Sequence, residues 1–290
     1  MDASPPLGTG LLAGFALAFG LVVGSFLNVV VHRLPRDESI AWPGSRCPRC
    51  QTPIAPYDNV PVLSWLLLRG RCRHCGVAIG WRYPALELGV GVLFVAIALR
   101  YGPTLETPLW MGFAAALVAA AVIDFEHQII PDEISLGGLV VGLVAVPALA
   151  ALAGDDVRAA AARSALGALL GGGILWSVGF AHARVSVALG RRFEHWPGDG
   201  EALPRPASLD YWVWFPGLGF GDVKLLAMIG AFVGPVGVVQ TLLCAALGGL
   251  VLGLAWIAVQ RRFDAPFGFA PALALGALLT VLFPGLGLVP

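Results

Sequence analysis

Two aspartates stand at the ends of apolar runs, where a membrane helix would meet water. Asp124 closes the charge-free run of residues 108–123, and Asp222 follows the glycine-rich turn of residues 217–221 and opens another apolar run. Ionisable side chains at membrane depth often mark functional sites. Two carboxylates that share a proton can hydrolyse a peptide bond, one as the base and the other as the acid. We therefore predict that the fold brings Asp124 and Asp222 together as an aspartyl protease dyad.

Each aspartate also has a structural interpretation. Asp124 could be an interfacial carboxylate in water, and Asp222 could cap the helix that it opens. Asp132 follows a proline and opens an apolar run, so we favour capping over catalysis for it. Gly219 and Gly221 favour a functional role for Asp222. Bare backbone beside a carboxylate suits an extended peptide substrate that needs main-chain partners.

The helix ends also suggest which carboxylate is the base. Asp222 lies at a predicted helix N-terminus, where the positive end of the helix dipole favours the anion. Asp124 lies near a predicted C-terminus, where the dipole favours the protonated acid. We therefore expect Asp222 to act as the base and Asp124 as the acid.

Four of the five cysteines form two Cys-x-x-Cys pairs with 21 residues between them. Two such pairs at this spacing are typical of a zinc site with four thiolate ligands, whereas a redox site needs only one pair. Four thiolates leave no coordination position for water, so the predicted role of the zinc is structural. The predicted ligands are Cys47, Cys50, Cys72 and Cys75.

The composition is that of a membrane protein. Of the 290 residues 58% are hydrophobic and 12% are charged, with a mean hydropathy of +0.81, whereas a soluble domain has about 25% charged residues. Apolar blocks long enough to cross a bilayer predict an all-α polytopic membrane protein with about eight transmembrane helices. The predicted spans are residues 9–31, 84–101, 107–125, 132–153, 161–182, 222–234, 236–259 and 267–288.

The Lys and Arg residues predict the orientation in the membrane. If the N-terminus lies outside, fifteen of the 18 Lys and Arg residues fall on the cytosolic side, as the positive-inside rule requires. The reverse orientation would also place the cysteine pairs in an oxidising compartment. The two large loops, residues 32–83 and 183–221, are then cytosolic, and Asp124 and Asp222 emerge at the same membrane face.

These predictions divide the chain into three parts. Residues 1–31 form an N-terminal transmembrane helix, and residues 32–83 form a cytosolic zinc-binding loop. Residues 84–290 form a membrane domain that carries the two aspartates and a cytosolic insert at about residues 183–221.

The motifs in this order resemble those of the type IV prepilin peptidase family, which are intramembrane aspartyl proteases of the GxGD kind. The resemblance covers most of the chain. It rests on residues 24–30, 33–35, 47–50, 59–61, 64–66, 72–75, 82–84, 87, 124, 130–132 and 219–225. The chain departs from the family in its long segment 183–216 and in Ser135, where many members have threonine.

The resemblance implies a function and a catalytic pair. An enzyme of this kind cleaves the leader of type IV prepilins or type II secretion pseudopilins at the cytosolic side of the bacterial inner membrane. Carried over by motif, the catalytic residues are Asp124 and Asp222. We expect these substrates and the lipid bilayer as partners, and no nucleic acid.

Members with such a zinc loop usually also methylate the new N-terminal residue, with S-adenosyl-L-methionine as the methyl donor. The chain has no glycine-rich dinucleotide fingerprint, and the loop is too short for a separate Rossmann domain. The candidates for contact with the donor are Arg82, Tyr83 and Glu87. Arg82 could instead be a positive-inside anchor, and Glu87 could cap or pair at the start of its helix.

Two other functions fit parts of the sequence. Intramembrane carboxylates and broken helices also occur in ion-coupled transporters, but these predict internal repeats, and we find none that is convincing. An inactive, zinc-stabilised membrane scaffold would tolerate substitution at either aspartate.

Overall fold

The computed structural model describes residues 7–191, 205–213, 218–260 and 268–284, which are all-helical as predicted, with two isolated β-bridges. The chain forms two compact units, Met1–Ile123 and Asp124–Pro290. The boundary falls inside α4 (Glu106–His127), so the last turn of this helix belongs to the second unit.

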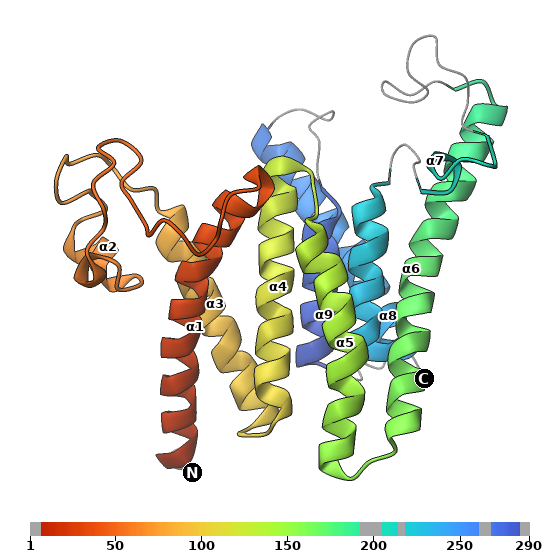
Figure 1. Ribbon diagram of the computed structural model, residues 1–290, viewed down its shortest axis with the longest axis horizontal. Helices are drawn as coiled ribbons and strands as arrows, with labels where there is room; N and C mark the ends of the chain where they lie inside the picture. The colour runs from red at the N-terminus through yellow and green to blue at the C-terminus, as the bar shows by residue number, and fades with distance from the viewer. Residues whose placement is uncertain (1–6, 192–204, 214–217, 261–267, 285–290) are drawn as a thin grey trace. The chain divides into compact units, whose positions relative to one another are not determined.

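The first unit is built on α1 (Leu7–Arg33) and α3 (Arg82–Tyr101), which lie side by side (Figure 1). A Cβ atom on Gly20 would come within 2.7 Å of Gly91 Cα, and one on Gly24 would come within 2.7 Å of Glu87 Cα. The two backbones therefore touch where side chains are absent, as small residues allow in membrane helices. The pairing of these positions shows that α1 and α3 run antiparallel.

The segment between α1 and α3 contains two 3₁₀ turns, η1 (Leu34–Arg36) and η2 (Pro56–Asp58), and the short helix α2 (Leu63–Leu67). It has a hydrogen-bonded framework of its own. Arg73 donates to both carboxylate oxygens of Asp58, at 2.7 and 2.6 Å, and Trp65 Nε1 donates to the Ile79 carbonyl oxygen at 3.0 Å. This bidentate pair joins η2 to the second cysteine pair.

The second unit contains α5 (Asp132–Ala153), α6 (Val157–Ala188), α8 (Phe220–Gln260) and α9 (Ala270–Leu282). Figure 1 shows α5, α6 and the start of α8 next to one another. Gly167 of α6 and Gly230 of α8 face each other so closely that a Cβ atom on either would overlap the backbone of the other. Ser164 Oγ donates to the Ala231 carbonyl oxygen at 2.7 Å and to that of Gly142 at 3.3 Å, so it links all three helices.

The helix α8 is broken at Gly234, whose φ of 73° and ψ of −179° are not helical. Beyond this break, α8 packs against α9. A Cβ atom on Gly249 would meet Ala272, and Thr241 Oγ1 lies 3.2 Å from Thr280 Oγ1, so these segments run antiparallel. Because α8 and α9 both begin at the cavity described below, the chain reverses direction at Gly234.

Within the part of the chain that the structure describes, six helices are long and apolar enough to cross a membrane: α1, α3, α4, α5, α6 and α8. The shorter apolar helix α9 follows them, and the reversal at Gly234 falls between the predicted sixth and seventh spans. The count of eight spans stays a prediction. The end of the eighth predicted span lies outside the described residues. Gly217 and two stretches of the insert, residues 192–204 and 214–216, also lie outside them.

The described part of the insert docks on α6. The helix α7 (Asp210–Val213) places the Trp212 ring in stacks with Trp176 and Phe180, at centroid distances of 6.2 and 5.4 Å. Trp176 Nε1 donates to the Trp212 carbonyl oxygen at 2.7 Å, and Arg184 donates to that of Tyr211. Aromatic rings with polar edges are typical of the membrane interface.

Candidate active site and metal cluster

Asp124 lies in the last turn of α4 and is 6% exposed. The helix ends at His127, and the next residue, Gln128, takes a left-handed conformation with φ of 55°. Both the backbone N–H and the side-chain amide of Gln128 donate to the Asp124 carbonyl oxygen at 2.9 Å. The helix end therefore fixes the backbone that carries the carboxylate.

Asp222 lies in the first turn of α8 and is 8% exposed. Its backbone N–H donates to the Gly219 carbonyl oxygen at 3.0 Å. Its Oδ1 atom is buried and has no hydrogen-bond partner among the described residues. Such a buried polar atom is costly, so it is a candidate for contact with a substrate or a water molecule.

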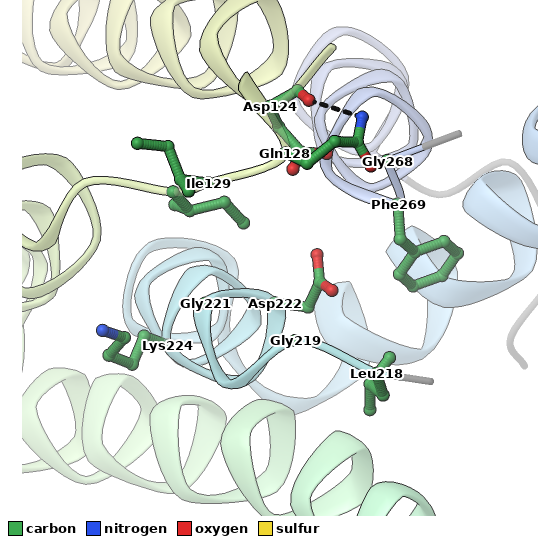
Figure 2. A pocket seen from close by; sticks show the side chains of 11 residues that line it. Asp124, Gln128, Ile129, Leu218, Gly219, Gly221, Asp222, Lys224, Gly268 and Phe269 are labelled. Carbon is green, nitrogen blue, oxygen red and sulfur yellow. Dashed lines mark hydrogen bonds between the residues drawn. The ribbon is translucent and has the colours of Figure 1, made fainter. Parts of the chain in front are cut away.

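The two aspartates line one cavity of about 410 Å³. Three stretches that are far apart in the chain form its walls: residues 124–130, residues 218–224 and residues 268–269. Figure 2 shows Asp124 and Asp222 on facing walls, with the Asp222 carboxylate directed into the space between them. All of these residues belong to the second compact unit.

The wall that precedes α9 was missed by the sequence analysis. The backbone N–H of Ala270, the first residue of α9, donates to Asp124 Oδ2 at 3.1 Å. A Cβ atom on Gly268 would overlap the Asp124 carboxylate. The sequence does contain a sign of this helix start, because Gly268 is followed by Pro271 at the beginning of an apolar run.

This contact alters the argument for the acid and base roles. Asp222 lies at the N-terminus of α8, as predicted, but Asp124 lies at the N-terminus of α9 as well as at the C-terminus of α4. Both carboxylates therefore meet the positive end of a helix dipole. The helix ends no longer distinguish the base from the acid.

The two glycines before Asp222 have different surroundings. Neither Gly219 nor Gly221 has a positive φ, so the backbone of this turn does not need glycine for its dihedral angles. A Cβ atom on Gly221 would lie 3.1 Å from Ile130 Cβ, whereas one on Gly219 would be in ordinary contact with Asp222 Oδ2 at 3.4 Å. Gly221 thus permits close packing against the segment that follows α4.

Asp132 does not cap α5. It is the first residue of the helix, Pro131 occupies the N-cap position, and there is no side-chain cap. The Asp132 carboxylate instead pairs with the Lys224 ammonium group. Lys224 lines the cavity, so this ion pair links the start of α5 to the mouth of the proposed site.

The four predicted zinc ligands lie together in the first unit. The Sγ atoms of Cys47, Cys50, Cys72 and Cys75 are all within 4.8 Å of one another. Cys47 Sγ and Cys75 Sγ are 3.7 Å apart, too far for a disulfide bond. In a tetrahedral zinc site with Zn–S bonds of about 2.3 Å, the sulfur atoms lie about 3.8 Å apart. The cluster therefore has the size and the donor set of a structural metal site.

Each cysteine pair forms the same kind of turn. The N–H of Cys47 donates to the Thr52 carbonyl oxygen at 3.0 Å, and the N–H of Cys72 donates to that of Val77 at 2.9 Å. Hydrogen bonds from the side chain and backbone of Thr52 lower the pKa of the Cys50 thiol to about 6. Backbone hydrogen bonds also lower the pKa of the Cys72 thiol. At Cys75 a backbone hydrogen bond from Val77 acts in the same direction, but burial and the neighbouring thiols raise its pKa to about 11. Thiolates are the form that binds metal, so the turns favour that form at Cys50 and Cys72.

The three candidates for the methyl donor are in different environments. Arg82 and Tyr83 are exposed at the start of α3, whereas Glu87 is buried. The Glu87 carboxylate accepts a hydrogen bond from the Val62 N–H at 2.7 Å, and Gly24 of α1 packs against the Glu87 Cα atom. Glu87 therefore connects α1, α3 and the metal-binding segment, which is the stretch between α1 and α3 that carries the cysteine cluster.

Comparison with known sequences gives matches along most of the chain. Residues 18–101 match the Bacterial Peptidase A24 N-terminal domain, and residues 111–254 match the type IV leader peptidase family. A protein from Burkholderia pseudomallei (strain 1026b), named prepilin leader peptidase/N-methyltransferase, is 36% identical over 315 residues, which cover 98% of this chain and 89% of the relative. The chain belongs to the type IV leader peptidase family.

Other proteins with the same name are similarly related. The Myxococcus xanthus (strain DK1622) protein is 39% identical over 273 residues, which cover 91% of this chain and 71% of the relative. The Pseudomonas aeruginosa protein is 32% identical over 303 residues, which cover 94% and 93%. No solved structure matches significantly. The four cysteines lie in the matched N-terminal domain, and both aspartates lie in the leader peptidase match.

Proposed function

We propose that this chain is a membrane-embedded aspartyl endopeptidase that removes the leader of type IV prepilins or type II secretion pseudopilins, with Asp124 and Asp222 as its catalytic residues. Its membership of the type IV leader peptidase family supports this class of reaction. The observation that carries the proposal is that two buried carboxylates line one cavity. The family match favours this function over a transporter or an inactive scaffold.

The reaction uses both carboxylates in turn. The ionised carboxylate takes a proton from a water molecule as the water oxygen attacks the scissile carbonyl carbon. The protonated carboxyl group gives its proton to the carbonyl oxygen. The tetrahedral intermediate then breaks its C–N bond. The leaving nitrogen gains the proton that the first carboxylate took from water, and a hydroxyl of the intermediate returns a proton to the second carboxylate. The two titrations belong to the pair rather than to either residue.

The substrate class fits a site at the edge of the membrane. A prepilin presents an apolar helix preceded by a short leader, and the cavity lies where α4 ends and where α8 and α9 begin. Water can reach such a site more easily than one at the centre of a bilayer. We propose a location in the bacterial inner membrane, with the N-terminus outside and the cavity on the cytosolic side.

We further propose that Gly219 and Gly221 leave the backbone of this wall open to an extended substrate. Gly219 is the better candidate, because Gly221 packs against Ile130. An extended peptide could then bond to main-chain groups beside Asp222.

We also propose that the cysteine cluster holds one zinc ion and that the chain methylates the new N-terminal residue with S-adenosyl-L-methionine. The four sulfur donors would hold the ion, which would stabilise the segment between α1 and α3. Among the candidates for the donor site, Arg82 and Tyr83 are exposed, while Glu87 is buried in a structural contact.

The experiment that tests the function uses the full chain in detergent or lipid with a synthetic prepilin peptide and a labelled methyl donor. Cleavage with methyl transfer supports both activities, and cleavage alone supports only the peptidase. If the purified, folded protein neither cleaves nor methylates such a peptide, the proposal is wrong and the rival functions return.

A further inference from the structure

We propose that the first turn of α9, together with Gly268 before it, is a positioning element for Asp124. This inference rests on the proposed peptidase function and extends the site to a third stretch of the chain. Two residues of this element have separate roles. The Ala270 N–H holds one oxygen of the carboxylate, and Gly268 leaves the space that the carboxylate occupies.

In the first turn of α9, one backbone N–H group is available to donate a hydrogen bond to Asp124. Those of residues 272–273 both donate to the Phe269 carbonyl oxygen at 3.1 Å. Pro271 has no N–H group. The N–H of Ala270 is therefore available to a partner outside the helix, and it donates to Asp124 Oδ2 at 3.1 Å. The proline thus removes the adjacent competing donor from the N-terminus of α9.

The contact is buried on both sides. Ala270 is 0% exposed and Asp124 is 6% exposed, and the N-terminal end of a helix favours a negative charge. A hydrogen bond from a backbone N–H to a carboxylate is stronger than one between neutral groups. The bond fixes the rotation of the Asp124 carboxylate and occupies one of its two oxygens.

The space at Gly268 is equally restrictive. A Cβ atom there would overlap Oδ2 and the carboxyl carbon of Asp124 and would lie 3.0 Å from Oδ1. A side chain at position 268 would therefore force the carboxylate to rotate away from its place in the cavity. Positioning within a fraction of an ångström matters, because a displacement of about 1 Å can reduce a rate on the order of 10²-fold.

A purely structural explanation of the contact is that Asp124 caps α9 from another helix. Under this explanation the contact serves only the fold. Removing the Ala270 N–H would then lower the unfolding midpoint and leave the kcat of the folded protein unchanged. Under the positioning proposal the folded variant loses kcat as well.

The decisive pair of variants differs in the donor. Ala270→Pro removes the N–H at the first position of a helix, where proline is common, and Ala270→Gly keeps the N–H. Because Phe269 has α-helical dihedrals, which a following proline disfavours, the unfolding midpoint of Ala270→Pro is measured beside its kcat. We expect Ala270→Pro to lower kcat for prepilin cleavage on the order of 10²-fold with little change in KM. Ala270→Gly, which keeps the N–H, should retain a much higher kcat than Ala270→Pro. Equal kcat values for the two variants would overturn the proposal.

A second variant keeps the proposal testable if Ala270→Pro does not fold. Gly268→Ala should also lower kcat, whereas Gly253→Ala, where an added Cβ meets nothing within 4 Å, should not. The unfolding midpoint of each variant in detergent shows whether the fold is retained. A folded Gly268→Ala with wild-type kcat overturns the inference. A wild-type protein that does not cleave at all contradicts the proposed function instead.

Discussion

The buried carboxylate of Glu87 in α3 accepts a hydrogen bond from the backbone N–H of Val62, at 2.7 Å. Val62 has φ of 60° and ψ of −49°, close to the classic γ-turn, a conformation that is rare and is strained for a β-branched residue. Such conformations persist where surrounding contacts hold them. Glu87 therefore holds a strained turn of the metal-binding segment against α3.

Substitutions at Glu87 can separate this structural role from a role in donor binding. We expect Glu87→Ala to cost about 1–3 kcal/mol of stability, because the Val62 N–H loses its partner. Glu87→Gln keeps an acceptor oxygen and should retain both the stability and the methyl transfer. The measurements are the thermal unfolding midpoint and the transfer of a labelled methyl group. Loss of methyl transfer in a stable Glu87→Gln would show that the charge itself binds the donor.

If Asp124 and Asp222 form the catalytic pair, substitution of either should abolish cleavage and spare methyl transfer. Asp124→Asn and Asp222→Asn should each reduce cleavage of a prepilin peptide by at least about 10²–10⁴-fold, because each removes one member of the acid–base pair. Methyl transfer to a peptide that is already cleaved should continue. Glu126→Gln, two residues after Asp124 and outside the cavity lining, is the control and should cleave normally. Substantial cleavage by either asparagine variant would refute the dyad.

The cysteine cluster predicts one zinc ion per chain by elemental analysis. Cys47→Ser and Cys75→Ser should each lose the metal, because a closed site with four ligands needs all of them. The metal-binding segment should then become sensitive to proteases, since it has little core of its own. Cys244→Ser, outside the cluster, should keep the full metal content. A metal-free chain that remains folded and active would show that the cluster is not a structural zinc site.

The contact between α6 and α8 predicts a loss of stability without a change in chemistry. In Gly167→Ala the new Cβ would overlap the Gly230 backbone, which cannot move aside as a side chain can. We expect a cost of about 1–3 kcal/mol, typical of overpacking, seen as a lower unfolding midpoint. Gly173→Ala in the same helix meets nothing within 4 Å and is the control. Equal midpoints for the two variants would mean that the helices separate easily.

Local sequence patterns determined much of this protein. Apolar runs of membrane length located the helices within a few residues, because a helix in lipid must be both long and apolar. The four-cysteine cluster was predictable because a metal knuckle is a short turn whose ligand spacing can be read from the sequence. The two aspartates stood out because a carboxylate beside a long apolar run is costly.

Tertiary structure alone decided the partners. Asp124 and Ala270 are 146 positions apart, and Lys224 and Asp132 are 92 positions apart. No local pattern links either pair. The helix-end argument for the acid and base roles failed for the same reason, since it considered only the helix that carries Asp124. The field and the hydrogen bond that act on this carboxylate come from α9, and only the packing of distant helices brings them there.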